Sequence, residues 1–148
     1  MTMKTLLDNI VTAMIDVNDG ATPTHHHYAD HVWLGMPKKL PMGDHCVMIV
    51  EALGMPNFYY KMCTSDPFTY DVDVVITVVN KGEVTKALSE NYTVTEKVMN
   101  AIGAAPSFSG ACVSTTIESV EFGDVAMSAD EKNLARGSRI IIRCSMEW

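Results

Sequence analysis

Apolar residues recur at helical spacing near the start of the chain, and this pattern predicts a helix over residues 3–16. Six apolar positions form one stripe on that helix: Leu6, Leu7, Ile10, Val11, Met14 and Ile15. Polar residues such as Thr5 and Asp8 fall on the opposite side. The turn residues Asn18-Asp19-Gly20 follow and end the helix.

Runs of apolar or alternating residues predict four main strands. Cys46–Leu53 is apolar on both faces, which is typical of a strand covered on two sides. Tyr70–Val79 and Arg139–Trp148 alternate apolar with polar positions, which indicates one buried face each. Val113–Phe122 is rich in Thr, Ser and Val and is predicted as a further strand. Phe58–Cys63 is a shorter candidate.

A second helix is predicted between the Tyr70 strand and the Val113 strand. Thr93 and Glu96 have the spacing of a capping box, in which each side chain accepts from the other residue's backbone amide. Apolar residues then recur up to Ile102, and Gly103 suits the end of the helix. Val84–Ser89 is either a separate helical turn or the start of one longer helix.

Two polar segments interrupt these elements. Residues 19–45 contain histidines, glycines and three prolines that oppose a helix, although residues 28–34 suit a short turn. Residues 123–137 form the second polar segment. Long connections in a small domain often carry function.

The order of elements predicts an α+β fold. We expect one domain over residues 1–148, with a mostly antiparallel sheet of four to five strands and two helices on one face. Its long polar loops would be residues 19–45 and 123–137.

Composition narrows the class of protein. The 148 residues are 47% hydrophobic, which argues against a disordered chain. The formal net charge of −7 argues against a broad basic surface that grips nucleic acid. No apolar run is long enough to predict a membrane span. Met1–Asp8 lacks the layout of a signal peptide, so we expect reduced thiols at Cys46, Cys63, Cys112 and Cys144.

The run His25-His26-His27-Tyr28-Ala29-Asp30-His31 is the most conspicuous chemical feature. His27 and His31 are four residues apart, which suits one face of a helical turn, and Asp30 offers a carboxylate to a metal. However, three consecutive histidines cannot all reach one ion, and no second cluster completes a ligand set. A polar surface loop is therefore the favoured interpretation, and a small metal-dependent enzyme is the alternative.

Other catalytic patterns are weak. Asp71 and Asp73 share one strand face about 7 Å apart, a spacing compatible with acid–base work but more typical of a solvated face. Ser107-Phe108-Ser109-Gly110 does not match a nucleophile elbow. Lys38 and Lys39 form only a pair, and nearby acids dilute Arg136. The sequence predicts no enzyme and no cofactor.

The layout resembles the tail terminator proteins of long-tailed bacteriophages, and more broadly their small neck and tail-completion proteins. The resemblance rests on the order of the pieces: the amphipathic Met3–Ile10 helix, the strands Cys46–Val50 and Tyr70–Val78, the capped helix and the last strand Ser138–Trp148. It covers most of the chain as architecture, without a diagnostic motif. A host-encoded ligand-binding or adaptor domain is a further alternative.

The resemblance implies a structural virion protein in the tail or neck, assembled in the host cytoplasm. It would form a ring, usually a hexamer, that ends growth of the tail tube and binds the head connector or stopper protein. DNA would pass through the lumen without specific binding, and the acidic charge suits such a conduit. We expect the interaction residues among His25, His26, His27, Tyr28, His31, Trp33, Lys38, Lys39, Asp71, Asp73, Asp130, Lys132 and Arg136.

Overall fold

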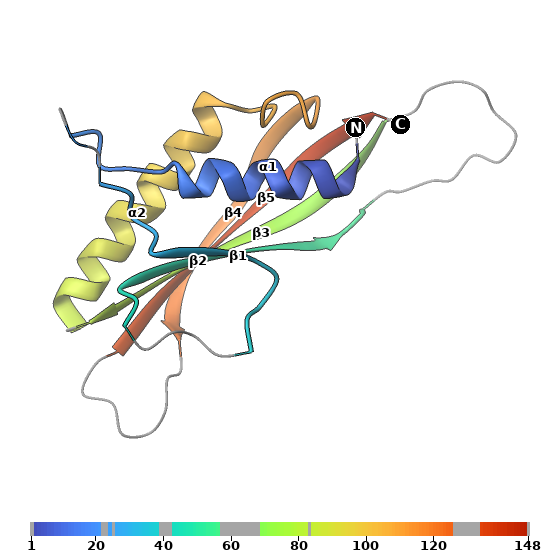
Figure 1. Cartoon of the computed structure of the whole chain (residues 1–148). Coiled ribbons are helices and arrows are strands. Elements are labelled where there is room, and N and C mark those ends of the chain that lie inside the picture. The colour runs from blue at the N-terminus through green and yellow to red at the C-terminus, as the bar shows by residue number, and fades with distance from the viewer. Residues whose placement is uncertain are drawn as a thin grey trace, which may run out of the picture.

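The computed structural model describes residues 2–21, 24, 26–38, 43–56, 69–82, 84–125 and 134–147. Its elements follow the order α1 (Met3–Ile15), β1 (His31–Leu34), β2 (Cys46–Gly54), β3 (Thr69–Gly82), α2 (Val84–Ala104), β4 (Ser114–Val125) and β5 (Leu134–Glu147). The strands form one sheet in the order β1-β2-β3-β5-β4 (Figure 1). β1 runs parallel to β2, and all other neighbours are antiparallel. The predicted α+β class is confirmed.

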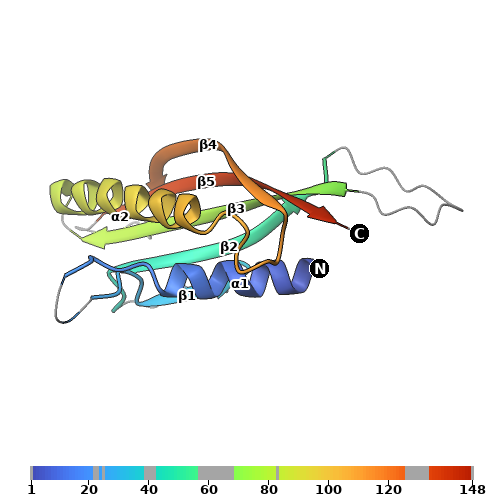
Figure 2. The same cartoon turned by 90° about the horizontal axis from the view of Figure 1, so that it is seen from above.

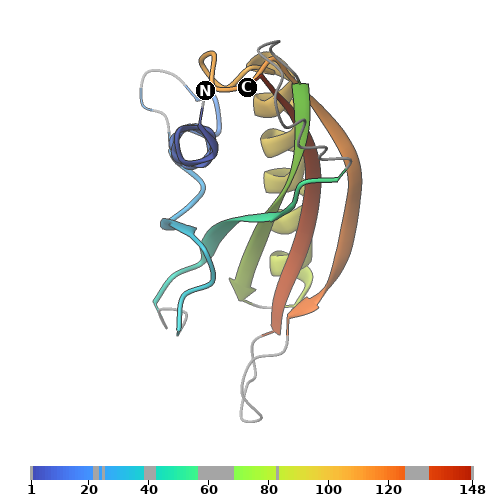
Figure 3. The same ribbon diagram turned by 90° about the vertical axis from the view of Figure 1, so that its right-hand side faces the viewer.

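Both helices pack on the same face of this sheet. The core combines Leu6, Ile10 and Met14 of α1 with Val94 and Val98 of α2. The even-numbered residues of β2, β3 and β5 pack against these helix residues, because side chains alternate between the two faces of a strand. α1 contacts β1 and β2, whereas α2 contacts β3 and β5. Figure 3 shows both helices on the concave side of the curved sheet, with α1 seen end-on near β1 and α2 running along β3 and β5. Figure 2 shows the same arrangement from above.

Helix α1 begins and ends where the sequence predicted. The Thr2 side chain accepts a hydrogen bond from the Thr5 amide (3.1 Å) and caps the first turn. Leu6, Ile10 and Met14 are fully buried, which confirms the centre of the predicted stripe. Ile15, however, is 48% exposed and lies outside it.

Helix α2 is one continuous helix, so the open question about Val84–Ser89 is settled in favour of the longer form. The capping box predicted at Thr93 and Glu96 is wrong. Thr93 lies in the helix interior, and its hydroxyl donates to the Ser89 carbonyl (3.1 Å) in the preceding turn. The buried face of the helix begins well before Thr93, at Ala87 and Asn91, and tertiary packing therefore outweighs the local capping signal.

The predicted polar segments are shorter than expected. The 19–45 segment contains β1, which hydrogen-bonds in parallel to β2 where a turn was expected. The 123–137 segment is also interrupted, because β4 extends to Val125 and β5 begins at Leu134. Arg136 therefore lies in a strand, paired with Asn80 and Asp124, and not in a loop. The strand proposed at residues 58–63 lies outside the described residues.

Buried polar pairs connect α2 to the sheet. Thr95 of α2 and Ser138 of β5 share a hydrogen bond between their hydroxyls (2.7 Å), and both residues are buried. Asn91 donates to the Asn80 side chain (3.0 Å) and to the Val78 carbonyl (3.2 Å). These bonds fix the position of α2 over β3 and β5, since a slip along the sheet would leave buried polar groups unpaired.

Candidate functional site

The structure separates the residues of the proposed metal site. His27 forms an isolated antiparallel bridge with Asn18, and His31 is the first residue of β1. The two histidines therefore do not share a face of a helical turn, and the spacing argument for a metal does not hold. Among the residues that the structure describes, no group of three or more His, Cys, Asp or Glu side chains is arranged to hold a metal ion.

Asp30 has a structural partner set. Its carboxylate accepts hydrogen bonds from the backbone amides of His45 (2.7 Å) and Cys46 (3.1 Å). The Asp30 amide in turn donates to the Cys46 carbonyl (2.8 Å). These bonds hold the chain before β1 against the start of β2. Asp30 therefore aligns the parallel strand pair.

His31 and Trp33 lie together on β1, facing away from the helices. Their rings stack with centroids 5.2 Å apart, and His31 Nδ1 lies 2.5 Å from a carboxylate oxygen of Asp44. Trp33 pairs in register with Ile49 of β2. His26 is exposed and Tyr28 is partly buried against the core. His25 lies outside the described residues.

The charged candidates are dispersed over the molecule. Lys38 is exposed just beyond β1, whereas Arg136 lies at the start of β5. Lys39, Asp130 and Lys132 lie outside the described residues, and so does Cys63. Lys38 and Arg136, the lysine and arginine candidates that the structure describes, therefore lie by different strands and do not belong to one cluster.

Asp71 and Asp73 lie on the sheet face opposite the helices, as their alternation predicted. Asp73 receives two hydrogen bonds from the Arg143 guanidinium, at 2.8 and 3.0 Å, a strong bidentate geometry. Asp71 accepts a hydrogen bond from the Ser145 hydroxyl (2.8 Å). Both carboxylates therefore have partners on β5, and this favours a structural role, in which they hold the Arg143 and Ser145 side chains, over acid–base catalysis.

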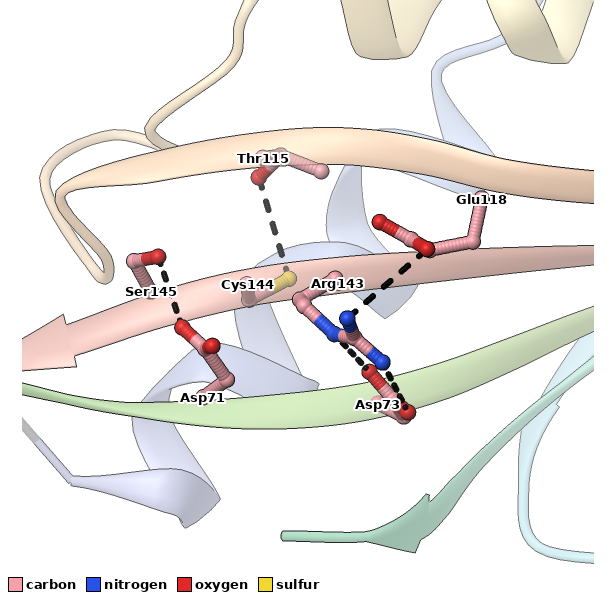
Figure 4. A network of polar contacts seen from close by, with 7 residues as sticks. All are labelled: Asp71, Asp73, Thr115, Glu118, Arg143, Cys144 and Ser145. Atoms are coloured by element: carbon pink, nitrogen blue, oxygen red, sulfur yellow. Dashed lines mark hydrogen bonds and ion pairs between the residues drawn. The ribbon is translucent and has the colours of Figure 1, made fainter. Parts of the chain in front are cut away.

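Arg143 also reaches a second strand. Figure 4 shows its guanidinium between Asp73 of β3 and Glu118 of β4, with 3.8 Å to the Glu118 carboxylate. Glu118 lies at a bulge, where the pairing of β4 with β5 shifts between Ile117 and Ser119. A bulge re-aims side chains, and here it brings Glu118 onto the polar face. The hydrogen bonds that Arg143 donates to the Asp73 carboxylate raise the pKa of Arg143, so its positive charge persists.

The described cysteines are buried free thiols. Cys46 and Cys144 lie in the apolar strand runs where core packing was predicted. Burial raises the pKa of each thiol to about 12, and the Asp30 carboxylate adds to this effect at Cys46. Cys112 and Cys144 both contact the Thr115 hydroxyl, at 3.4 and 3.7 Å. A protonated buried thiol is a poor nucleophile, so these cysteines are packing residues.

The two outer strands of the sheet carry exposed apolar side chains that the sequence did not identify as a site. Leu34 and Met36, on β1 and just after it, are 51% and 63% exposed. Phe122 of β4 is 53% exposed and packs edge-on against Tyr92 of α2, with ring centroids 5.1 Å apart. Strand β1 was missed because four residues offer too short an alternation. Phe122 is the last residue of the predicted Val113–Phe122 strand, and an aromatic side chain at that position could have indicated a contact surface.

A hollow of about 380 Å³ lies where the two helices approach each other. Small side chains leave this space, since Ala13 of α1 faces Ala101 and Ala104 of α2. Asn9 crosses nearby and donates to the Phe108 carbonyl (2.9 Å). The hollow adds a shallow, mostly apolar surface on the helix face and brings no reactive groups together.

Comparisons with known proteins place no further constraint on the chain. A search against protein-family profiles found no match, and a search of curated proteins found none either. Over the part of the chain that the structure describes, neither helix combines the length and the apolar character that crossing a membrane requires. The architecture and the surfaces described above are therefore the basis for a functional interpretation.

Proposed function

We propose that this protein is a ring-forming structural protein of a bacteriophage tail or neck, of the tail terminator type. The observation that carries the proposal is the arrangement of elements. An amphipathic helix, a long connection, a run of strands, a second helix and two closing strands follow one another in the order on which the family resemblance rests. Both helices on one face of one sheet also agree with the expected α+β architecture.

The surfaces of the fold support a role in assembly. The helices cover one face, and the partly exposed ion pairs of Asp73, Arg143 and Glu118 lie on the other. The outer strands β1 and β4 each have one side without a partner strand among the described residues. Open edges invite pairing with another chain, and symmetric assembly is the usual way in which small proteins use such surfaces.

The charge also suits this function. A ring of six copies with a net charge of −7 each would surround its lumen with an acidic field. Such a field disfavours tight contact with the phosphate backbone and lets DNA pass. The partners in this proposal are other copies of the chain, the tail tube protein and the head connector or stopper protein.

The test is the mass of the purified protein in solution, measured by size-exclusion chromatography with light scattering, alone and with tail tube. We expect a ring with the mass of a hexamer that binds one end of the tube in electron micrographs. A species that stays monomeric alone and with tail tube would contradict the proposal. Stoichiometric zinc or iron in the same preparation, lost on His27→Ala, would favour the metal-dependent alternative.

A further inference from the structure

The two open edges of the sheet cannot contact each other within one copy. β1 and β4 are the first and last strands in the order β1-β2-β3-β5-β4. At about 4.8 Å between neighbours, four strand spacings separate the edges by roughly 19 Å. Within the part of the chain that the structure describes, neither edge has a strand partner that buries its exposed apolar side chains.

The edges differ in chemistry. The β1 edge, defined here by β1 and the residues up to Lys38, exposes Leu34 and Met36. Residues 31–38 contain one lysine and one histidine, and two carboxylates reach them from β2 and the residues before it: Asp44 lies against His31 Nδ1, and Glu51 accepts a hydrogen bond from the Met36 amide (3.1 Å). Both carboxylates are bound within the edge itself, so the exposed charge that the β1 edge offers to another molecule is the Lys38 ammonium.

The β4 edge has the opposite sign. It is defined by β4 together with Tyr92 of α2, and it exposes the Tyr92–Phe122 aromatic pair. The twelve residues of β4 contain Glu118, Glu121 and Asp124, and no Lys, Arg or His. Arg143 and Arg139 approach Glu118 and Glu121 from the inner strand only to 3.8 Å, so these carboxylates still have room for a cation from outside.

Strand direction favours the same match. β1 and β2 run in one direction, β3 runs against β2, β5 against β3, and β4 against β5. β4 is consequently antiparallel to β1. When neighbouring copies are related by a rotation about an axis along the strands, β4 of one copy meets β1 of the next in the antiparallel sense. That is the commoner and slightly more stable sense of pairing.

We propose that the β1 edge of one copy docks against the β4 edge of the next, so that copies of this chain assemble head to tail. Apolar side chains of Leu34 and Met36 would cover the Tyr92–Phe122 pair, and Lys38 would approach the β4 carboxylates. Such a contact joins two different surfaces and closes into a ring when the rotation between copies allows it. The inference rests on the proposed ring and names the surfaces that build it.

The experiment uses two exposed positions, one on each edge. Met36→Asp blocks the β1 edge and Phe122→Asp blocks the β4 edge, and each should weaken self-association about tenfold or more, leaving monomers. Mixed in equal amounts, the two variants should form a one-to-one dimer and nothing larger. The free β4 edge of Met36→Asp binds the free β1 edge of Phe122→Asp. The outer edges of this dimer both carry the substitutions, so no further copy can add. Native mass spectrometry reads this out directly.

Three controls make the result specific. Asn100→Asp adds the same charge at an exposed position of α2 and should keep the wild-type mass. The double variant Met36→Asp/Phe122→Asp should pair with neither single variant. Lys38→Glu tests the β1 edge again if Met36→Asp fails to fold, as judged by circular dichroism, and it should also weaken the ring.

The outcomes separate this inference from the proposed function. Rings that persist in both single variants would overturn the two docking surfaces and leave the ring itself intact. Monomeric variants that do not pair on mixing would overturn the head-to-tail arrangement. A wild-type chain that is monomeric alone and with tail tube would contradict both the docking surfaces and the proposed function.

Discussion

Thr95 and Ser138 show how single residues position a helix on this sheet. Their hydroxyls lie 2.7 Å apart in a fully buried setting between α2 and β5. A hydroxyl buried without a partner costs the free energy of its lost hydration, whereas an apolar pair of the same shape avoids that cost. The pair therefore specifies where α2 sits more than it adds to net stability.

Single and double substitutions of Thr95 and Ser138 should separate the cost of one unpaired hydroxyl from the effect of removing both. We expect Thr95→Val or Ser138→Ala to lower the free energy of unfolding by about 1–3 kcal/mol, because each leaves one buried hydroxyl unpaired. The double variant should recover most of the loss. Urea unfolding of the four proteins measures this cycle, and strictly additive losses would contradict the pairing.

The buried thiols of Cys46 and Cys144 should lower the free energy of unfolding at alkaline pH. Burial raises each pKa from 9.0 to about 12, so the folded state holds the proton more tightly than the unfolded state. The stability from each thiol is fully present below pH 9 and is lost as the pH rises toward 12. The loss should be about 1.4 kcal/mol per pH unit for each thiol in that window.

Urea unfolding between pH 8 and 10.5 measures this slope. Cys144→Ala should be less stable than the wild type at every pH in this range, because the substitution leaves a cavity. Its free energy of unfolding should fall less steeply with pH, since of the two thiols only Cys46 still contributes to the slope. An unchanged slope in Cys144→Ala would show that this thiol does not titrate differently in the two states.

At the scale of elements, the continuity of α2 is the clearest departure from the sequence-based expectation. The exposed Thr93 lies in mid-helix, with its hydroxyl bonded to the Ser89 carbonyl. Proline there would remove a backbone hydrogen bond and would clash with the preceding turn. We expect Thr93→Pro to lower the free energy of unfolding by about 3 kcal/mol or more.

Thr93→Ala is the matched control. In a continuous helix it should change stability by less than about 0.5 kcal/mol, since alanine is a good helix former. If a helix began at Thr93, the same alanine would cost about 1 kcal/mol through the lost cap. Thermal unfolding followed by circular dichroism distinguishes the two patterns.

For the whole molecule, the place of β5 matters most. The last strand lies between β3 and β4, so it hydrogen-bonds on both sides and supplies Ile140, Ile142, Cys144 and Met146 to the core. A chain shortened to residues 1–142 loses two of these buried side chains and part of both strand pairings. It should lose cooperative unfolding altogether.

A chain shortened to residues 1–146 serves as the control. It removes the exposed Glu147 and the residue after it, and it keeps every described core residue. We expect this chain to unfold cooperatively near the wild-type temperature. Cooperative unfolding of the 1–142 chain in the same calorimetric measurement would contradict the central role of β5.

Periodicity was a reliable guide wherever one face of an element packs on the core. The spacing of Leu6, Ile10 and Met14 predicted α1, and the alternation that starts at Tyr70 and at Ile140 predicted β3 and β5. When one face of an element is buried, its apolar residues recur with the period of that element. β1 escaped prediction because its four residues give too short an alternation. The ion pair of Asp73 and Arg143 escaped because 70 residues separate the partners, and no local pattern relates them.

The sequence by itself determined the α+β class, the buried faces of the main helices and strands, and the acidic charge, since all of these follow from local spacing and composition. Only the tertiary structure decided that β5 lies inside the sheet, that α2 runs unbroken through Thr93, and that β1 and β4 form its two open edges. These features depend on which strands meet across the chain. That choice is made by packing and hydrogen bonds between segments far apart in the chain, which no local pattern records.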